Sequence, residues 1–196
     1  METDFEVLIT SFIETNIGVS DNFLGDALAK HLKSNLLSLH LQNLLLPAGT
    51  GNADRLLHDQ EVRSDVIYWL DRKHENTYEN EFFNKIEDFI RYLNISCYAG
   101  IVDYEFHYSL YEPGSFYKQH RDQFQNNSGR KYSMISYLNA DWKKEDGGEL
   151  LIQQGQTNQS ISPTLGKTVF FNSNHLIHEV LTTQQRRMSI TGWLKG

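Results

Sequence analysis

The sequence predicts a mainly β fold, a sandwich or double-sheet jelly roll, supported by helices from the N-terminal half. After residue 100 the chain is a series of short runs rich in β-branched and aromatic residues, separated by turn residues. Before residue 100, apolar residues recur at the spacing of amphipathic helices. A length of 196 residues suits one domain of ordinary size. We therefore expect residues 1–196 to form a single domain, with helical support over 1–100 and a jelly-roll core over 101–196.

Two amphipathic helices are expected in the first half. The apolar positions of the first follow a Ser20-Asp21 cap and are Phe23, Leu24, Leu28, Leu32 and Leu36. Those of the second are Phe82, Phe83, Ile86, Phe89, Ile90 and Leu93. Between these helices, residues 47–60 carry the proline, glycine and asparagine of a long loop. Residues 65–70 (DVIYWL) are short, β-branched and aromatic, as in a strand.

Seven further strands are expected after residue 100. They are YEFHYSLY (104–111), KYSMISYLN (131–139), GELLIQQ (148–154), QSISP (159–163), KTVFFNS (167–173), IHEVLT (177–182) and MSITGWL (188–194). Turn residues between them include Pro113-Gly114, Asn126-Asn127-Ser128-Gly129, Gly147-Gly148 and Gly166. Many short strands at close spacing are typical of two packed sheets, and the helices would cover the outer face of one of them.

Composition limits the functions that the chain can have. The single cysteine, Cys97, excludes an internal disulfide and a thiolate cluster, so nitrogen and oxygen atoms would hold any metal. We expect Cys97 itself to be a small buried apolar residue. The chain begins METDFEV, which is acidic where a signal peptide is basic, and no apolar run approaches the roughly 18 residues of a membrane span. We expect a soluble cytoplasmic protein.

The charge of the chain disfavours nucleic acid as a partner. The formal net charge is -7, so the average surface repels phosphate backbones. A local basic patch remains conceivable around a few cations near the middle of the chain, which are Lys118, Arg121, Arg130 and Lys131.

A candidate metal site begins at His120 and Asp122. Side chains at i and i+2 of an extended segment share a face, so this imidazole and this carboxylate can touch one ion. A second histidine from a distant strand, His178 or His175, would complete a set of two histidines and one carboxylate. Such a set leaves positions open on iron(II) for a chelating co-substrate and for dioxygen.

The motif His-x-Asp is weak when it occurs alone, because most such histidines lie on the surface beside a solvated carboxylate. The segment RRMSITGW strengthens it. In a strand, Arg187, Ser189, Thr191 and Trp193 would share one face, so a fixed guanidinium would point into the same pocket. A guanidinium pairs with a planar carboxylate through two parallel hydrogen bonds. His107, in the strand 104–111, is interpreted as a packed or edge residue.

Four stretches of the sequence together resemble one enzyme family. They are YEPGSFYKQHRD (111–122), YLNADWKKEDGGEL (137–150), HEVLTTQQRRMSITGW (178–193) and EVRSDVIYWL (61–70). In combination they resemble the prolyl-hydroxylase branch of the iron(II) and 2-oxoglutarate dioxygenases, which includes the oxygen-sensing prolyl hydroxylases and their bacterial relatives. The resemblance covers most of the chain. It implies a double-stranded β-helix, or jelly-roll, core and a mobile substrate lid over the last of these stretches.

The resemblance also implies roles for individual residues. It selects His178 as the third metal ligand beside His120 and Asp122, because His178 lies nine positions before Arg187. Arg187 would clamp 2-oxoglutarate, helped by Tyr137, Tyr111, Ile135, Leu150 and Ser189. Substrate contacts would come from Arg130, Tyr117, Trp193 and Arg63.

The function implied is hydroxylation of a prolyl residue in a protein or peptide, with release of succinate and carbon dioxide. Its cofactors would be iron(II), 2-oxoglutarate and dioxygen, with ascorbate as reductant. Alternatives stay open at this point. They are hydroxylation of a free amino acid or other small molecule, demethylation of nucleic acid, zinc-dependent hydrolysis, and ligand binding by a jelly-roll domain without turnover.

Overall fold

The computed structural model describes residues 2–49, 61–122, 129–155 and 157–196, and the structural statements below refer to them. Three α-helices are present in these residues: α1 (Glu2–Thr15), α2 (Asp26–Leu41) and α3 (Thr77–Cys97). The strands are β1 (Ile17–Ser20), β2 (Leu46–Pro47), β3 (Val66–Trp69), β4 (Asp103–Tyr111), β5 (Tyr117–His120), β6 (Arg130–Tyr137), β7 (Leu150–Gln154), β8 (Thr157–Ile161), β9 (Thr168–Asn172), β10 (His178–Val180) and β11 (Arg187–Lys195). Two short 3-10 helices cover Arg72–His74 and Lys144–Asp146.

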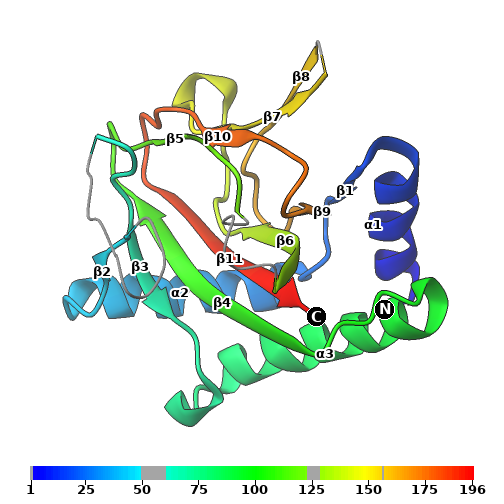
Figure 1. Cartoon of the computed structure of the whole chain (residues 1–196). Coiled ribbons are helices and arrows are strands. Elements are labelled where there is room, and N and C mark those ends of the chain that lie inside the picture. Colours follow the sequence, from blue (N-terminus) through cyan, green and yellow to red (C-terminus); the bar gives the residue numbers. More distant parts are fainter. Residues whose placement is uncertain (1, 50–60, 123–128, 156) are drawn as a thin grey trace.

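The strands form two antiparallel sheets, which confirms the predicted jelly-roll core. The larger sheet has seven strands in the order β1-β9-β6-β11-β4-β3-β2, and the smaller has four in the order β5-β10-β7-β8. In Figure 1 the smaller sheet lies at the top of the view, and α2 and α3 run along the bottom with the larger sheet between. Strand β11 pairs with β4 over its whole length and with β6 over most of it, so it lies in the middle of the larger sheet.

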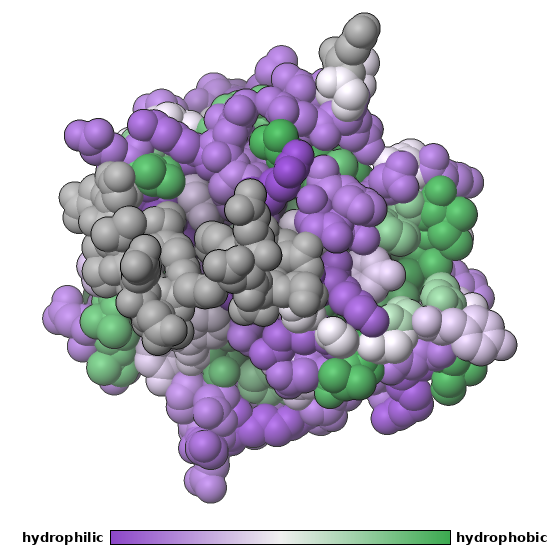
Figure 2. Space-filling model, in the orientation of Figure 1, coloured by the Kyte–Doolittle hydropathy of each residue, from purple (hydrophilic) through white to green (hydrophobic). Residues whose placement is uncertain are grey.

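The helices cover the outer face of the larger sheet, as the sequence predicts. Helix α3 begins at Asn76, whose side-chain oxygen accepts hydrogen bonds from the backbone N–H groups of Tyr78 and Glu79. Its fully buried Phe82 and Phe89 pack edge-on against Phe106 of β4 and Phe170 of β9. The face in Figure 2 is mostly hydrophilic, and apolar side chains gather mainly over α1 at its right.

A second apolar cluster fills the space between the two sheets. The larger sheet contributes Ile17, Tyr111, Ile135, Tyr137, Val169 and Phe171, and the smaller sheet contributes Leu150, Ile152, Ile161 and Val180. Alternation along β6 explains the division: Ile135 and Tyr137 face this space, while Met134 packs with the helices. A polar cavity opens beside this cluster, and strands of both sheets form most of its walls.

The N-terminal half differs from the expectation in two respects. The sequence analysis expected two helices, but α1 is a third, and β1 and β2 add strands to the larger sheet. The predicted Ser20-Asp21 cap is wrong: Ser20 ends β1, and α2 begins after Gly25, which makes no side-chain cap hydrogen bond. Pairing of β1 with β9 is a long-range contact, which explains why a local cap signal failed here.

Three other expectations concern single residues or loops. Cys97, expected to be buried, is exposed at the end of α3. Most of the predicted loop 47–60 and most of the turn 126–129 lie outside the described residues. No helix in the described ranges has both the length and the apolar character that crossing a membrane requires.

Candidate active site

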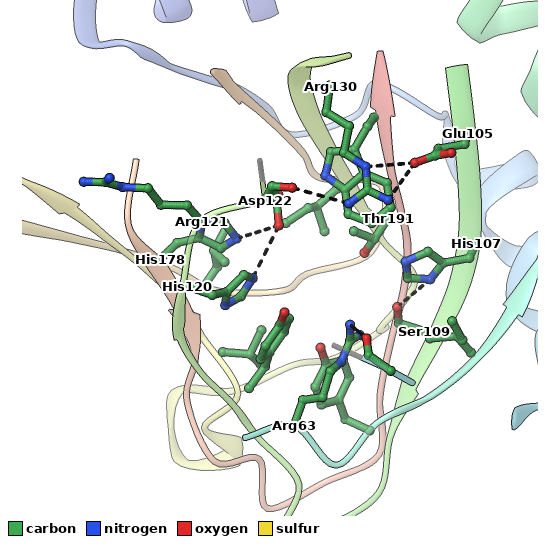
Figure 3. Close-up of a pocket in the computed structure, with 18 of the residues that line it drawn as sticks. Arg63, Glu105, His107, Ser109, His120, Arg121, Asp122, Arg130, His178 and Thr191 are labelled. Carbon is green, nitrogen blue, oxygen red and sulfur yellow. Dashed lines mark hydrogen bonds and ion pairs between the residues drawn. The ribbon is translucent and has the colours of Figure 1, made fainter. Parts of the chain in front are cut away.

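A cavity of about 380 Å³ lies between the two sheets and collects most of the predicted site residues. Its walls include predicted residues from six strands and two loops: Arg63, Tyr111, Tyr117, His120, Asp122, Arg130, Ile135, Leu150, His178, Arg187 and Trp193. Two predicted residues, Tyr137 and Ser189, are fully buried and do not line it. In Figure 3, His120, Asp122 and His178 lie on one side of this cavity, and Glu105, His107, Ser109 and Thr191 lie on the other.

The three predicted metal ligands converge at the cavity. Asp122 Oδ1 lies 3.4 Å from His120 Nε2 and 3.6 Å from His178 Nε2. One potential ligand atom from each residue lies within 4.8 Å of the others. The register explains this meeting, because His178 of β10 pairs directly with His120 of β5. His175, the competing histidine, is exposed and lies outside this group.

Hydrogen bonds orient both imidazoles for metal binding. His120 Nδ1 lies 2.8 Å from the carbonyl oxygen of Lys118, and His178 Nδ1 lies 3.3 Å from that of Leu176. Since a carbonyl oxygen only accepts, each Nδ1 carries the proton and each Nε2 has its lone pair free. Both lone pairs and the Asp122 carboxylate therefore face one point. A buried set of two imidazoles and a carboxylate with such second partners fits a divalent iron ion.

The charges of the three residues stabilise one another. Burial alone would raise the pKa of Asp122, but the imidazoles of His178 and His120 hold it well below its usual range. Burial and the neighbouring His178 lower the pKa of His120. Burial also opposes protonation of His178, but the Asp122 carboxylate outweighs it and raises the pKa of His178.

These shifts predict a pH dependence of metal binding. The pKa of His178 is raised from 6.5, so His178 takes up a proton as the pH falls through that raised value, and a metal must then displace this proton to bind. The pKa of His120 is lowered, so His120 stays neutral over the same interval. We expect Co(II) affinity to level off above the raised pKa and to fall about tenfold per pH unit below it. Calorimetric titration between pH 8 and pH 5.5 measures this. An affinity independent of pH in that interval would contradict it.

A pair of buried serines fixes the second oxygen, Oδ2, of the Asp122 carboxylate. Ser133 Oγ donates to Asp122 Oδ2 at 2.6 Å and lies 2.9 Å from Ser173 Oγ, and both serines are fully buried. These two hydrogen bonds fix the plane of the Asp122 carboxylate so that Oδ1 faces the histidines. The sequence analysis did not find it, because it depends on the pairing of β6 with β9, which places Ser133 beside Phe171.

Removal of the Ser133 hydroxyl should weaken metal binding without removing a ligand. We expect Ser133→Ala to lower Co(II) affinity about 10- to 100-fold, the usual effect of losing an outer partner of a ligand. Ser136→Ala is the matched control. Ser136 is a buried serine on the same strand, but it faces away from the metal ligands and bonds Thr168 Oγ1 at 2.8 Å. Equal affinities of the two variants would show that Ser133 does not orient Asp122.

A buried guanidinium lies at one end of the cavity. Arg187 is 1% exposed, its Nε donates to the carbonyl oxygen of Gly148 at 2.8 Å, and its Nη2 has no partner within the described ranges. The rings of Tyr111 and Tyr137 flank it at 5.0 and 5.1 Å, and the Tyr137 hydroxyl is also buried with no hydrogen-bond partner among the residues that the structure describes. Unsatisfied buried donors are costly, so this arrangement fits a carboxylate ligand that would accept from both.

The glycine pair before β7 makes room for this guanidinium. Gly148 has a φ of +67°, and a Cβ at that position would lie 3.1 Å from Arg187 Cδ and 3.0 Å from the Thr183 side chain. A larger residue would therefore push Arg187 out of place.

The residues predicted to contact substrate lie in the same cavity but already have partners. Arg63 makes a two-point ion pair with Asp65, at 2.8 and 2.7 Å, and stacks 4.3 Å above the Tyr117 ring. Arg130 lies 2.6 Å from Glu105 and 3.4 Å above the ring of Trp193. The basic patch suggested by the sequence is therefore partly neutralised, because its Arg130 is paired.

The sequence analysis missed several residues of the wall opposite the metal ligands. His107, expected to be a packed or edge residue, is buried and lines the cavity, as do Trp69 and Ser109. Alternation along β4 was an available signal, because residues 105, 107, 109 and 111 share a face with the predicted Tyr111.

Comparisons with known proteins agree with this geometry. The sequence model of the 2OG-Fe(II) oxygenase superfamily matches residues 106–195, which contain all three candidate ligands and Arg187. A prolyl-4-hydroxylase of Pseudomonas putida has a similar structure, with a TM-score of 0.87, 26% identity, and coverage of 97% of this chain and 98% of that one. In sequence and in fold the chain is similar to the 2OG-Fe(II) oxygenases, and to prolyl hydroxylases among them.

Two further relatives extend the similarity over nearly the whole chain. A hypoxia-inducible factor prolyl hydroxylase of Caenorhabditis elegans is 28% identical over 200 residues, covering 96% of this chain and 28% of the relative. A Trichoplax adhaerens prolyl hydroxylase, solved with a hypoxia-inducible factor peptide, has a TM-score of 0.87 at 20% identity, covering 99% of this chain and 90% of that one. The chain spans between 14% and 46% of the length of the curated relatives it matches.

Proposed function

We propose that the chain is a dioxygenase that uses iron(II) and 2-oxoglutarate to hydroxylate a prolyl residue of a protein, releasing succinate and carbon dioxide. One observation carries this proposal: a converging pair of histidines and a carboxylate shares one cavity with a buried guanidinium whose Nη2 has no partner among the described residues. The first set suits iron(II), and the second suits a dicarboxylic co-substrate. The similarity to prolyl hydroxylases over nearly the whole chain supports it.

In this proposal each side of the cavity has its own task. His120, Asp122 and His178 hold the metal. Arg187 and the Tyr137 hydroxyl receive the far carboxylate of 2-oxoglutarate, with Tyr111, Ile135, Leu150 and Ser189 forming or supporting the surrounding wall. When bound, iron(II), 2-oxoglutarate and dioxygen would supply the oxidising chemistry: one oxygen atom of dioxygen would enter succinate as the co-substrate loses carbon dioxide, and the other would be inserted into a C–H bond of the substrate.

The protein itself provides fixed geometry and exclusion of water. Arg187, Tyr111 and Tyr137 are at most 4% exposed, so the co-substrate end of the cavity is dry. The substrate would enter beside Arg63, Tyr117, Arg130 and Trp193, whose mutual stacking fixes them before binding. We further propose that residues 1–196 act as one unit in the cytoplasm, with ascorbate as reductant.

The experiment is a succinate assay with Fe(II), 2-oxoglutarate and ascorbate, combined with mass spectrometry of proline-containing peptides. We expect succinate, and a mass gain of one oxygen on a prolyl residue, for the wild type and neither for Asp122→Ala. Succinate with free amino acids but no peptide product would favour a small-molecule hydroxylase instead. A wild-type protein that binds 2-oxoglutarate but forms no succinate under any of these conditions would indicate a binding domain without turnover.

A further inference from the structure

The inner face of the larger sheet presents its side chains in rows that cross the strands. Arg187 pairs with Tyr111 in the first row, Ser189 with Ser109 in the second, and Thr191 with His107 in the third. Trp193 pairs with Glu105 in the fourth row. This face of the sheet thus begins at Arg187, proposed to hold the co-substrate, and ends at Trp193 and Glu105. His107 lies between these two ends.

His107 is held tightly on this wall. It is 2% exposed, its ring packs against those of Trp69 and Trp193 with centroid distances of 5.0 and 5.6 Å, and Trp69 is its cross-strand partner on β3. Figure 3 shows the ring beside Thr191, on the wall opposite the metal ligands. Burial, together with the charge of Arg63, lowers the pKa of His107 to about 4, so the imidazole is neutral at pH 7.

Hydrogen bonds define which nitrogen of His107 faces the cavity with a lone pair. Nδ1 lies 3.2 Å from the carbonyl oxygen of Tyr108 and 3.1 Å from Ser109 Oγ. The carbonyl oxygen of Tyr108 only accepts, whereas the Ser109 hydroxyl can accept or donate, so both contacts are hydrogen bonds when Nδ1 carries the proton and Nε2 keeps its lone pair. No hydrogen bond reaches Nε2 within the described residues, although the residue lines the cavity.

The same wall also has an unused donor. Trp193 Nε1 is buried and has no partner in the described residues. One free acceptor and one free donor on neighbouring residues complement a peptide group, which offers one N–H and one C=O. A prolyl residue has no N–H, so the donor of a prolyl substrate must come from an adjacent residue.

We propose that His107 is a specificity-determining residue whose Nε2 accepts a hydrogen bond from a main-chain N–H next to the target residue of a polypeptide substrate. This inference rests on the proposed function and adds a substrate contact on the wall opposite the metal. His107 positions the substrate and does not take part in the oxidation. It therefore affects KM more than kcat.

Two small probes test this contact directly. N-acetyl-L-proline methylamide carries the N–H in question, and N-acetyl-L-proline methyl ester is nearly the same shape but has oxygen in its place. We expect wild-type protein to show a KM about threefold to tenfold lower for the amide, the effect of one neutral hydrogen bond, with similar kcat. Binding measured through the fluorescence of Trp69 and Trp193 should show the same preference.

Variants identify the residue responsible. His107→Leu should bind both probes equally, because it removes the acceptor but keeps an apolar side chain, whereas the matched control His175→Leu should keep the preference. A preference that persists in His107→Leu, or an equal KM for both probes in the wild type, would overturn the assignment. The comparison of the amide and the ester with wild-type protein tests the assignment even if His107→Leu does not fold. Absence of succinate with either probe, despite a fluorescence preference for the amide, would count against the proposed function and leave the His107 contact supported.

Discussion

Replacement of His178 by alanine is expected to abolish metal binding and succinate formation. His178 provides one of three ligands, and no other histidine, cysteine or acidic residue of the described ranges joins this group. Loss of an outer partner of a ligand already costs about 10- to 100-fold in affinity, so loss of the ligand itself should cost more than about 100-fold. Co(II) titration by calorimetry and absorption spectroscopy, with a succinate assay in parallel, measures both losses.

The matched control is His175→Ala, three residues earlier in the chain. His175 is exposed and lies away from the group, so this variant should bind metal and form succinate like the wild type. His178 is 3% exposed and packs edge-on against Phe171 at 4.9 Å, so its removal also leaves a small cavity. Asp122→Asn, which keeps the side-chain volume, separates loss of metal binding from loss of folding. Wild-type metal affinity in both His178→Ala and Asp122→Asn would rule out the proposed centre.

Short-range patterns predicted those parts of the structure that local rules govern. The strands described after residue 100, except β5, were found because alternation and turn residues act over a few positions, and β4, β6 and β11 follow them closely. The missed helix α1 also had a local signal: Phe5, Leu8, Ile9 and Phe12 recur at helical spacing and pack on the core. The helical spacing of these residues therefore indicates α1 without any long-range contact.

Other features depend on how distant strands pair, which one sequence does not specify. The hydrogen bond from Ser133 to Asp122 and its link to Ser173 exist only because β6 and β9 are neighbours. The choice of His178 over His175 likewise depends on the register of β10 with β5. In the sequence analysis it came from the family spacing to Arg187, not from geometry.

Substitution of Arg187 should remove co-substrate binding while leaving the metal centre intact. The guanidinium is 1% exposed and its Nη2 lacks a partner in the part of the chain that the structure describes, so a bound carboxylate would gain a hydrogen bond there. Hydrogen bonds to charged groups are worth about 1.5–3 kcal/mol each. We expect Arg187→Met to weaken 2-oxoglutarate binding by about 100-fold or more, and Arg187→Lys to recover only part of it, because an ammonium group cannot form two parallel bonds. Calorimetry with Mn(II)-loaded protein measures these affinities.

The same substitution gives a second, opposite readout in stability. A buried charge that has no counter-ion among the described residues is costly. Replacing Arg187 by an apolar side chain of similar length should therefore not lower the thermal midpoint of unfolding of the co-substrate-free protein. The midpoint should rise if the lost hydrogen bond to Gly148 stabilises the fold by less than the buried charge destabilises it. Arg186→Met is the matched control, since Arg186 is exposed and pairs with Glu112 at the surface. Because a residue kept for folding would lose stability together with ligand affinity, the two readouts distinguish a binding group from a structural one. A lowered midpoint with unchanged 2-oxoglutarate affinity in Arg187→Met would assign the guanidinium to the fold.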